Sequence, residues 1–476
     1  MSGRSRPRRH TRAHSRLLIA ASILACSATT AATTPHALRP APEAPIPAFS
    51  RKYRTTCSTC HTAAPKLNVL GEAFRLNGYR FPENDALLRR DEPVPLGEDP
   101  WKDLWPRAIW PGELPAAVPL ALRIQNDVQV SRGAAGGRSW SYRFPHEIYL
   151  LAGTTLGEGV AAFLELEWSR ERGTQLVQAK LEFQDFLPIL PPRALNLWVG
   201  LQNLYLFTFA DRQIDRAARE NFLWQQFRAS DLELGGAGRG ARSANEFQLR
   251  QSQPALELNG LAAAGRLFYA VGLAQGAGAQ TADNNNHKDI YYKLRYKLGG
   301  LRLDGTYPPG GRPVTGGRGQ LMDRSIILEH FGYAGAEPVA RGSQDRHRAF
   351  GVNARTLYGP LDLGFGWMAA RNENPWGPDS PGALSWSSLF GKAEVLFLPW
   401  LIGSLKLDYF TTDASAESDF TVTDADQTRV LPGLVLLVRQ NVRAVVEGDL
   451  YASDAPPPQR DSRRPHSLWI RLDVAF

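Results

Sequence analysis

The chain has 476 residues, a formal net charge of +8 and a pI of about 9.4, yet its basic character does not indicate nucleic-acid binding. Six arginines and no acidic residue lie within residues 1–16, and without these arginines the formal charge falls to 8 − 6 = +2. Its three cysteines leave no pair for a structural disulfide, because Cys26 lies in the leader and Cys57 and Cys60 belong to a motif. No apolar run reaches the ~20 residues that a membrane-spanning helix needs.

Residues 1–32 are predicted to be a secretory signal peptide. The arginine-rich start precedes an apolar run at 17–25 and then small residues from Ser27 to Thr33. That order is typical of a cleaved export signal. The alternative is a lipoprotein signal with Cys26 as the lipid-bearing residue, although Leu24, two places before it, fits that motif poorly.

Residues 33–90 are predicted to form a small α-helical domain that carries one covalent haem c. Two cysteines separated by two residues and followed at once by histidine, as in Cys57-Ser58-Thr59-Cys60-His61, are typical of c-type haem attachment. Cys57 and Cys60 would each bond one porphyrin vinyl group, and His61 would be the proximal iron ligand. A zinc site would need more ligand cysteines, and a thioredoxin-like thiol pair would need a βαβ context.

The residues after the motif predict a short helix. Leu67, Leu70 and Phe74 recur three and four residues apart, and Asn77-Gly78 supplies a helix stop. The run FSRKYRTTCSTCHTAAPKLNVLGEAFRLNGYRF (49–81) resembles the haem-binding segment of the outer-membrane cytochrome c–porin fusions of iron-oxidising bacteria. The resemblance implies a monohaem domain ahead of a β-barrel. It also implies that electrons pass from extracellular Fe(II) to a periplasmic cytochrome c.

Residues 91–117 are predicted to be a connector rich in proline and tryptophan. Trp101, Trp105 and Trp110 alternate with prolines, which prevent a continuous helix or a central strand. We expect an ordered segment whose aromatic side chains pack against the barrel wall or its rim. An extended linker is the alternative.

Residues 118–476 are predicted to form a transmembrane antiparallel β-barrel of about 16 strands. Segments of roughly ten residues alternate apolar and polar side chains, as where Ile290 and Leu294 are interleaved with Lys293 and Arg295. A soluble β-sandwich also alternates. The number of segments favours the barrel, and the last strand ends on Phe476, which resembles the assembly signal of bacterial outer-membrane proteins.

The predicted strands follow from the alternation and the turn residues. They lie at 120–131, 145–155, 160–169, 175–186, 195–203, 254–259, 265–274, 288–298, 301–306, 346–357, 361–370, 385–397, 401–411, 428–438, 442–451 and 467–476. This set makes long and short connections alternate strictly, with short turns on the periplasmic side. It assigns 326–328 to a loop. Eighteen strands, with a hairpin hidden in 204–253, is the alternative, and Pro432 is an unexplained residue within a strand.

Charged side chains of both signs are predicted to face the barrel lumen. Such polarity is expected in any porin and marks no particular site. These residues are Glu165, Glu167, Lys180, Glu182, Lys293, Arg295, Lys297, Lys406, Asp408, Arg443 and Glu447.

The sixth ligand of the haem iron is left open by the sequence. The candidates are Met322, Met368, His36, His146, His287, His330, His347 and His466. A five-coordinate iron would instead favour a peroxidase-like or gas-binding enzyme, but no motif supplies the acid–base residue that such a pocket needs.

The sequence therefore predicts an outer-membrane electron-transfer cytochrome–porin, with its haem domain in the barrel or on its periplasmic side. The expected partners are extracellular Fe(II) or another electron donor, a periplasmic cytochrome c and outer-membrane lipid, with no nucleic acid. Any enzymatic activity would resemble that of an iron(II) oxidase. The alternatives are electron export to extracellular metal oxides and a passive porin in which the haem is a structural plug.

Overall fold

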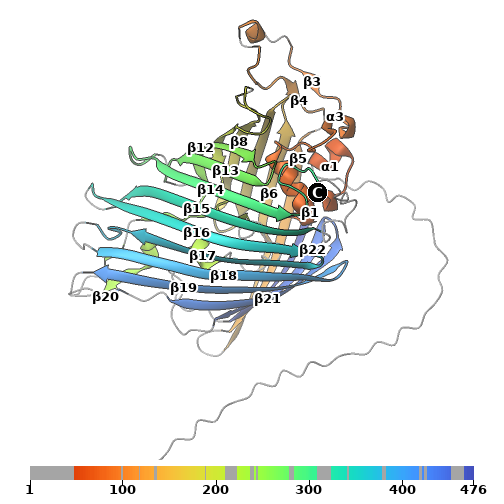
Figure 1. Ribbon diagram of the computed structural model, residues 1–476. Coiled ribbons are helices and arrows are strands. Elements are labelled where there is room, and N and C mark those ends of the chain that lie inside the picture. Colours follow the sequence, from red (N-terminus) through yellow and green to blue (C-terminus); the bar gives the residue numbers. More distant parts are fainter. Residues whose placement is uncertain are drawn as a thin grey trace, which may run out of the picture. The chain divides into compact units, whose positions relative to one another are not determined.

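A computed structural model describes residues 48–476, except 98–99, 105, 117, 133–136, 188, 209–221, 236–240, 243–244, 278–282, 308–322, 340–341, 378–381, 417–420, 423–425 and 452–465. The predicted signal peptide, His36 and Met322 lie outside the described residues. Within them, sixteen antiparallel strands form a closed barrel (Figure 1). The fold class predicted from the alternation is confirmed.

The barrel strands follow one another in chain order, and the last pairs with the first. They are β5 (Leu120–Arg132), β6 (Arg138–Thr155), β7 (Val160–Ser169), β8 (Gly173–Phe183), β9 (Asn196–Gln202), β12 (Gln253–Ala262), β13 (Leu267–Ala274), β14 (Asp289–Gly299), β15 (Arg324–Pro338), β16 (Gln344–Tyr358), β17 (Leu361–Asn372), β18 (Gly382–Leu398), β19 (Leu401–Ala416), β21 (Gln427–Arg439), β22 (Val442–Tyr451) and β23 (Ser467–Ala475).

The two faces of each strand differ as the alternation predicts. On β14, Ile290 and Leu294 are 54% and 42% exposed on the outside, whereas Lys293 and Arg295 are buried in the lumen. An outward apolar face suits lipid, and a polar interior suits a barrel lumen. Among the described residues, no helix is both long and apolar enough to cross a bilayer.

Two strand predictions near 300–330 are wrong, and the errors cancel in the count. Residues 301–306 form no strand but a turn, whereas 326–328 belong to β15. β15 pairs with β14 along Ile290↔Ala334 to Gly299↔Ser325, so it is a wall strand. The first error arose because Gly299-Gly300 reads as a tight turn; in the structure the connection from β14 continues to residue 323.

The connections fall on two rims, one of which also carries the end of the chain. This rim, the N-terminal rim, has the connections 156–159, 184–195, 263–266, 300–323, 359–360, 399–400 and 440–441. Its turns at 157–159, 359–360 and 399–400 are tight, as predicted. The strict alternation of long and short connections is wrong, because 184–195 and 300–323 are long while 170–172, on the opposite rim, is short.

The described residues of the segment 203–252 add no strand to the barrel wall, and several of them pack inside the barrel. The short elements of this segment are η3 (Leu223–Gln225), η4 (Ala229–Asp231), β10 (Glu233–Gly235) and β11 (Ala241–Arg242). β10 pairs with β11 and with β20 (Thr421–Val422), in a sheet separate from the barrel. A hairpin is therefore present in this segment, but the eighteen-strand alternative is wrong.

An aromatic cluster forms the main core inside the barrel. Phe207, Phe222, Trp224 and Phe227 from the inserted segment pack against wall residues such as Phe390. Ring centroids lie 4.8 Å apart for Phe222 and Phe390. Apolar burial thus fills part of a lumen that the strand pattern predicts to be polar.

The residues ahead of the barrel form short elements at the N-terminal rim. They are α1 (Ala48–Tyr53), η1 (Cys57–Thr59), β1 (His61–Ala63), β2 (Lys66–Leu67), α2 (Val69–Leu76), α3 (Asp85–Leu88), β3 (Val94–Pro95), η2 (Pro100–Asp103) and β4 (Glu113–Leu114). β3 and β4 pair, and Gly112 N donates to Leu156 O at 2.9 Å, so the connector is joined to the rim. Trp110 lies edge-on to Phe183 of the wall, with 6.5 Å between the ring centroids, as expected for an aromatic side chain that packs against the barrel. Trp105 lies outside the described residues.

Pro432 is accommodated within β21 because it faces outward and interrupts one ladder. It pairs with Leu405 of β19, but the pairing of β21 with β22 skips from Val430↔Leu450 to Gly433↔Glu447. A proline cannot donate a backbone hydrogen bond, so a gap in the ladder is expected at this position.

Candidate functional site

The two cysteines and the histidine of the motif lie on one tight turn at the barrel mouth. The turn is closed by Thr59 N to Thr56 O at 3.0 Å and by Cys60 N to Cys57 O at 3.2 Å. Cys57, Cys60 and His61 are all partly exposed, and His61 begins β1. The structure therefore brings the three predicted haem-binding residues together on a single turn.

Helix α2 is held against this turn by its N-cap residue. The Asn68 side chain accepts from Gly71 N at 2.7 Å and donates to Thr59 O at 2.9 Å. The first bond caps the helix, and the second joins the cap to Thr59, one of the two residues between the cysteines. Gly71 permits this contact, because a Cβ at that position would lie 2.0 Å from Cys60 O.

The thiol chemistry of the turn is not that of a thiolate redox pair. Cys57 and Cys60 form no disulfide. Burial raises the pKa of the Cys57 thiol, and burial followed by the proximity of Cys57 raises that of Cys60 to about 12. Redox-active cysteines have lowered pKa values, so the direction of both shifts does not favour a thiolate redox pair.

An aromatic cluster supports the turn from behind. Tyr53, Phe74 and Tyr79 are buried together, with Phe49 stacked on Tyr79 at 5.1 Å between ring centroids. Cys60 packs against this cluster at its edge. Of the apolar residues that predict this helix, Phe74 is buried on α2, whereas Leu67 lies on β2, before the helix, and is buried there.

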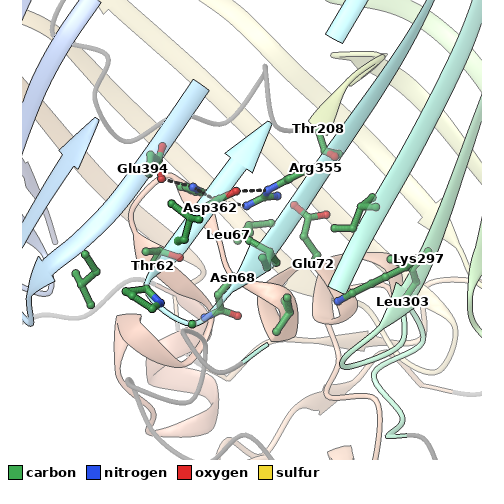
Figure 2. A pocket seen from close by; sticks show the side chains of 18 of the residues that line it. Thr62, Leu67, Asn68, Glu72, Thr208, Lys297, Leu303, Arg355, Asp362 and Glu394 are labelled. Atoms are coloured by element: carbon green, nitrogen blue, oxygen red, sulfur yellow. Dashed lines mark hydrogen bonds and ion pairs between the residues drawn. The ribbon is translucent and has the colours of Figure 1, made fainter. Parts of the chain in front are cut away.

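The segment is fixed to the barrel by ion pairs inside the lumen. Lys66 Nζ contacts both Asp362 on β17 and Glu394 on β18. Arg355 on β16 contacts the same Asp362 at 2.6 Å, and Figure 2 shows Asp362 between Glu394 and Arg355. The side chains of Lys66 and Glu394 are buried and those of Asp362 and Arg355 are 18% and 12% exposed, so breaking the ion pairs would be costly.

A pocket lined by both charged and apolar side chains lies at this ion-pair cluster, between the N-terminal segment and the wall (Figure 2). Thr62, Asn68 and Glu72 face it from the segment, and Lys297 and Arg355 from the wall. None of Cys57, Cys60 and His61 lines it. Glu72 lies 3.5 Å from Arg295, so the predicted lumen charges Arg295 and Lys297 face the N-terminal segment.

An apolar patch of the inner wall lies next to the motif. Ala63, two residues after His61, belongs to one buried apolar cluster with Ile402, Val435, Val445 and Trp469 on the inward faces of β19, β21, β22 and β23. Ser58 N also donates to Gln440 Oε1 at 3.4 Å, in the turn after β21. The motif therefore faces an inner wall that is apolar where most of the lumen is polar.

The structure brings none of the described distal-ligand candidates to His61. Met368 is buried in the aromatic cluster of the lumen, and His146 is paired with Asp127 at 2.7 Å. His330 faces outward and contacts Tyr292 Oη at 2.8 Å. His287, His347 and His466 lie at or near the rim opposite the motif.

Sequence reasoning missed the side chains that dock the segment. Lys66, Asp362 and Glu394 are distant in the chain, and no local pattern pairs them. The sequence did offer one signal: the alternation along the two strands predicts that Asp362 and Glu394 point into the lumen. It does not predict which cation pairs with them.

Comparison with known proteins gives structural neighbours only. No family model matches the chain, and no curated protein matches it. Among solved structures, it is similar to the outer-membrane protein OmpT of Vibrio cholerae in its trimer form (9% identity, TM-score 0.48, covering 75% of this chain and 98% of that one). It is also similar to an anion-selective porin from Comamonas acidovorans (12%, 0.48, 75% and 98%) and to OmpF of Salmonella typhi (10%, 0.47, 75% and 97%).

The class of the protein follows from its own architecture. A closed barrel of sixteen strands has no free sheet edge, and its outward face is apolar along strands such as β14 and β19. Only helices and closed barrels satisfy every backbone group in lipid. The chain is a porin-like β-barrel of the outer-membrane type.

Proposed function

We propose that this protein is an outer-membrane electron-transfer cytochrome–porin. In this proposal Cys57 and Cys60 attach one haem c and His61 is its proximal iron ligand. The protein takes one electron from extracellular Fe(II), which becomes Fe(III), and passes it to an oxidised periplasmic cytochrome c. The observation that carries the proposal is the Cys57–Cys60–His61 turn, held at the mouth of a closed barrel.

The residues of the turn fit a covalently bound haem. Both thiols are free and partly exposed, so each is available for a thioether bond. Ala63 and the inner-wall patch give an apolar surface beside His61, which suits the face of a porphyrin. When bound, a c-type haem supplies reversible one-electron transfer, with a potential set by its ligands and surroundings.

The filled lumen favours electron transfer over free solute passage. The inserted segment packs Phe207, Trp224 and Phe227 against the wall, and the N-terminal segment is joined to β17 and β18 at one mouth. A passive porin would keep a water-filled lumen. The barrel would then separate the redox group from lipid while both ends remain accessible to water.

Haem attachment and its reduction by Fe(II) test the proposal. Pyridine haemochrome spectra of the purified protein should report one covalent haem per chain, lost in Cys57→Ser and Cys60→Ser. Under anaerobic stopped-flow conditions, oxidised protein mixed with Fe(II) should show rapid growth of the reduced Soret and α bands. Adding an oxidised c-type cytochrome should then reverse them.

Each competing reading gives a different result. Wild-type protein without covalent haem, made in a host competent for haem maturation, would overturn the proposal. Haem that stays oxidised with Fe(II) but discharges to ferric oxides once reduced would indicate electron export. Haem that reacts with neither, in a protein that conducts ions, would indicate a passive porin with a structural plug.

A further inference from the structure

A buried acidic cluster lies at the rim opposite the haem motif. Asp289 opens β14, Glu337 is near the end of β15, and Asp345 and His347 are near the start of β16. All four side chains are buried, with exposures of 0%, 6%, 0% and 5%. The strand directions place them at the same mouth of the barrel, on the lumen side.

Several other buried acids of the lumen pair with an arginine or a lysine, whereas, among the described residues, this cluster shows no such pair. Asp127 pairs with Arg471 at 2.6 Å, and Asp408 with Arg429 at 3.1 Å. In the part of the chain that the structure describes, no lysine or arginine pairs with Asp289, Glu337 or Asp345. Buried charges in proteins are either paired or bound to metal ions.

Neutral donors bond both oxygens of each aspartate but only one oxygen of Glu337. Asp345 accepts from the side-chain amides of Asn245 and Asn372, both at 2.7 Å, and from Asn374 N at 2.9 Å. Asp289 accepts from the Tyr333 hydroxyl and from Ala336 N at 3.2 Å. Glu337 accepts from Asn284 at one oxygen, while its Oε1 has no hydrogen-bond partner.

His347 points into this cluster with neither ring nitrogen hydrogen-bonded. Its ring is stacked on Phe247 at 4.3 Å between centroids, which fixes the plane of the imidazole. Its Nε2 lies 3.7 Å from Asp289 Oδ2, too far for a hydrogen bond. This distance between the two atoms is less than twice the length of a metal–ligand bond, which is roughly 2.1 Å, so one ion can contact both atoms.

We propose that His347, Asp289 and Glu337 form a binding site for a divalent first-row transition-metal ion at the mouth opposite the haem motif. Imidazole with carboxylates suits such ions. Among the described residues, no three His, Cys, Asp or Glu side chains are already placed to hold one metal ion. Binding therefore requires Glu337 to turn its unbonded oxygen toward His347 and Asp289. Identifying the ion as Fe(II) rests on the proposed function, in which this mouth faces outward.

The site lies close to the surface of the barrel mouth. Asn284, which donates to Glu337 Oε2 at 3.2 Å, is itself exposed, so the carboxylate lies one side chain beneath the surface. An ion entering the mouth would contact the unbonded Oε1 and neutralise the charge of this carboxylate. The site would then hold Fe(II) at the outward entrance of the barrel.

Mn(II) titration of the full-length haem-loaded protein in detergent tests the site, with the free-ion EPR signal as the readout. We expect one Mn(II) per chain, with affinity about tenfold or more weaker in Glu337→Gln and His347→Gln, the loss typical when a metal's supporting residues are removed. His330→Gln, a histidine on the outer face, is the control and should bind as the wild type does. Unchanged affinity in both site variants, or no binding by the wild type, would overturn the site.

The same proteins separate this site from the proposed function. If Mn(II) binds as predicted but Fe(II) never reduces the haem, the site stands and the electron-transfer proposal fails. If Fe(II) reduces the haem at equal rates in wild type, Glu337→Gln and His347→Gln at every Fe(II) concentration, the function stands and the site plays no part in it. A folded-barrel gel shift for each variant excludes misassembly as the cause.

Discussion

Gly71 is the residue at which α2 approaches the haem motif most closely. A methyl group there would lie 2.0 Å from the Cys60 carbonyl oxygen, which belongs to the backbone and cannot rotate away. Either α2 or the cysteine turn must move. The Asn68 bonds that join the two would be strained in either case.

Gly71→Ala should therefore loosen the turn without disturbing the barrel. Overpacking of this kind costs about 1–3 kcal/mol, which corresponds to roughly 5- to 150-fold faster amide exchange through local opening. Hydrogen-exchange mass spectrometry of residues 57–76 measures this. Gly112→Ala is the matched control, because its nearest neighbour is 3.9 Å from the added carbon. Equal protection in both variants would contradict the steric argument.

At the scale of elements, the β1–β2 hairpin joins the N-terminal segment to the barrel. Lys66 on β2 is held by carboxylates on two neighbouring wall strands, and all three side chains are at most 18% exposed. Removing one partner of a buried ion pair costs about 3–5 kcal/mol, because the remaining charge loses its compensation. An exposed pair is worth about 0–1 kcal/mol.

Lys66→Met should accordingly release the hairpin from the lumen part of the time. In planar bilayers we expect the wild type to be mostly closed and Lys66→Met to open more often. Lys288→Met, which removes an exposed pair with Asp283, is the control and should behave as the wild type does. Identical conductance of all three proteins would show that the hairpin does not close this mouth.

At the scale of the whole molecule, the barrel is sealed by its first and last strands. β23 pairs with β5 from Ser467↔Ser131 to Ala475↔Arg123. Phe476 extends this seam, donating from its N to Leu122 O at 2.8 Å and accepting from Leu122 N at 2.6 Å. The terminal residue therefore completes the ladder that closes the sheet.

The protein should fractionate with outer membranes and migrate faster on gels before heating than after, since a closed barrel resists unfolding by detergent. Phe476→Ser should reduce the folded band severalfold, while Phe476→Tyr should retain it. Both variants keep the backbone bonds to Leu122, so the difference isolates the aromatic side chain. Recovery of the wild type as a soluble protein would contradict the membrane assignment.

The sequence by itself determined the local features of this protein. Alternation with period two places Lys293 and Arg295 inward and Ile290 and Leu294 outward, because successive strand residues point to opposite faces. The spacing of Cys57, Cys60 and His61 likewise needs no distant residue, and the structure places all three on one turn. The strand near 300–330 is placed wrongly from the sequence, since a double glycine can precede either a new strand or a long connection.

Tertiary structure alone decided what fills the barrel. The alternation along each strand predicts which charges point inward. It does not predict the partners of Lys66, which are separated from it by about three hundred residues of chain and depend on which strands adjoin in the closed sheet. The burial of Phe207 and Trp224 in the lumen, and the meeting of Asp289, Glu337 and His347 at one mouth, have the same origin. The pairing register of the consecutive strands β14, β15 and β16 brings the last three residues to one mouth, while the curvature of the closed barrel places the inserted aromatics against the wall.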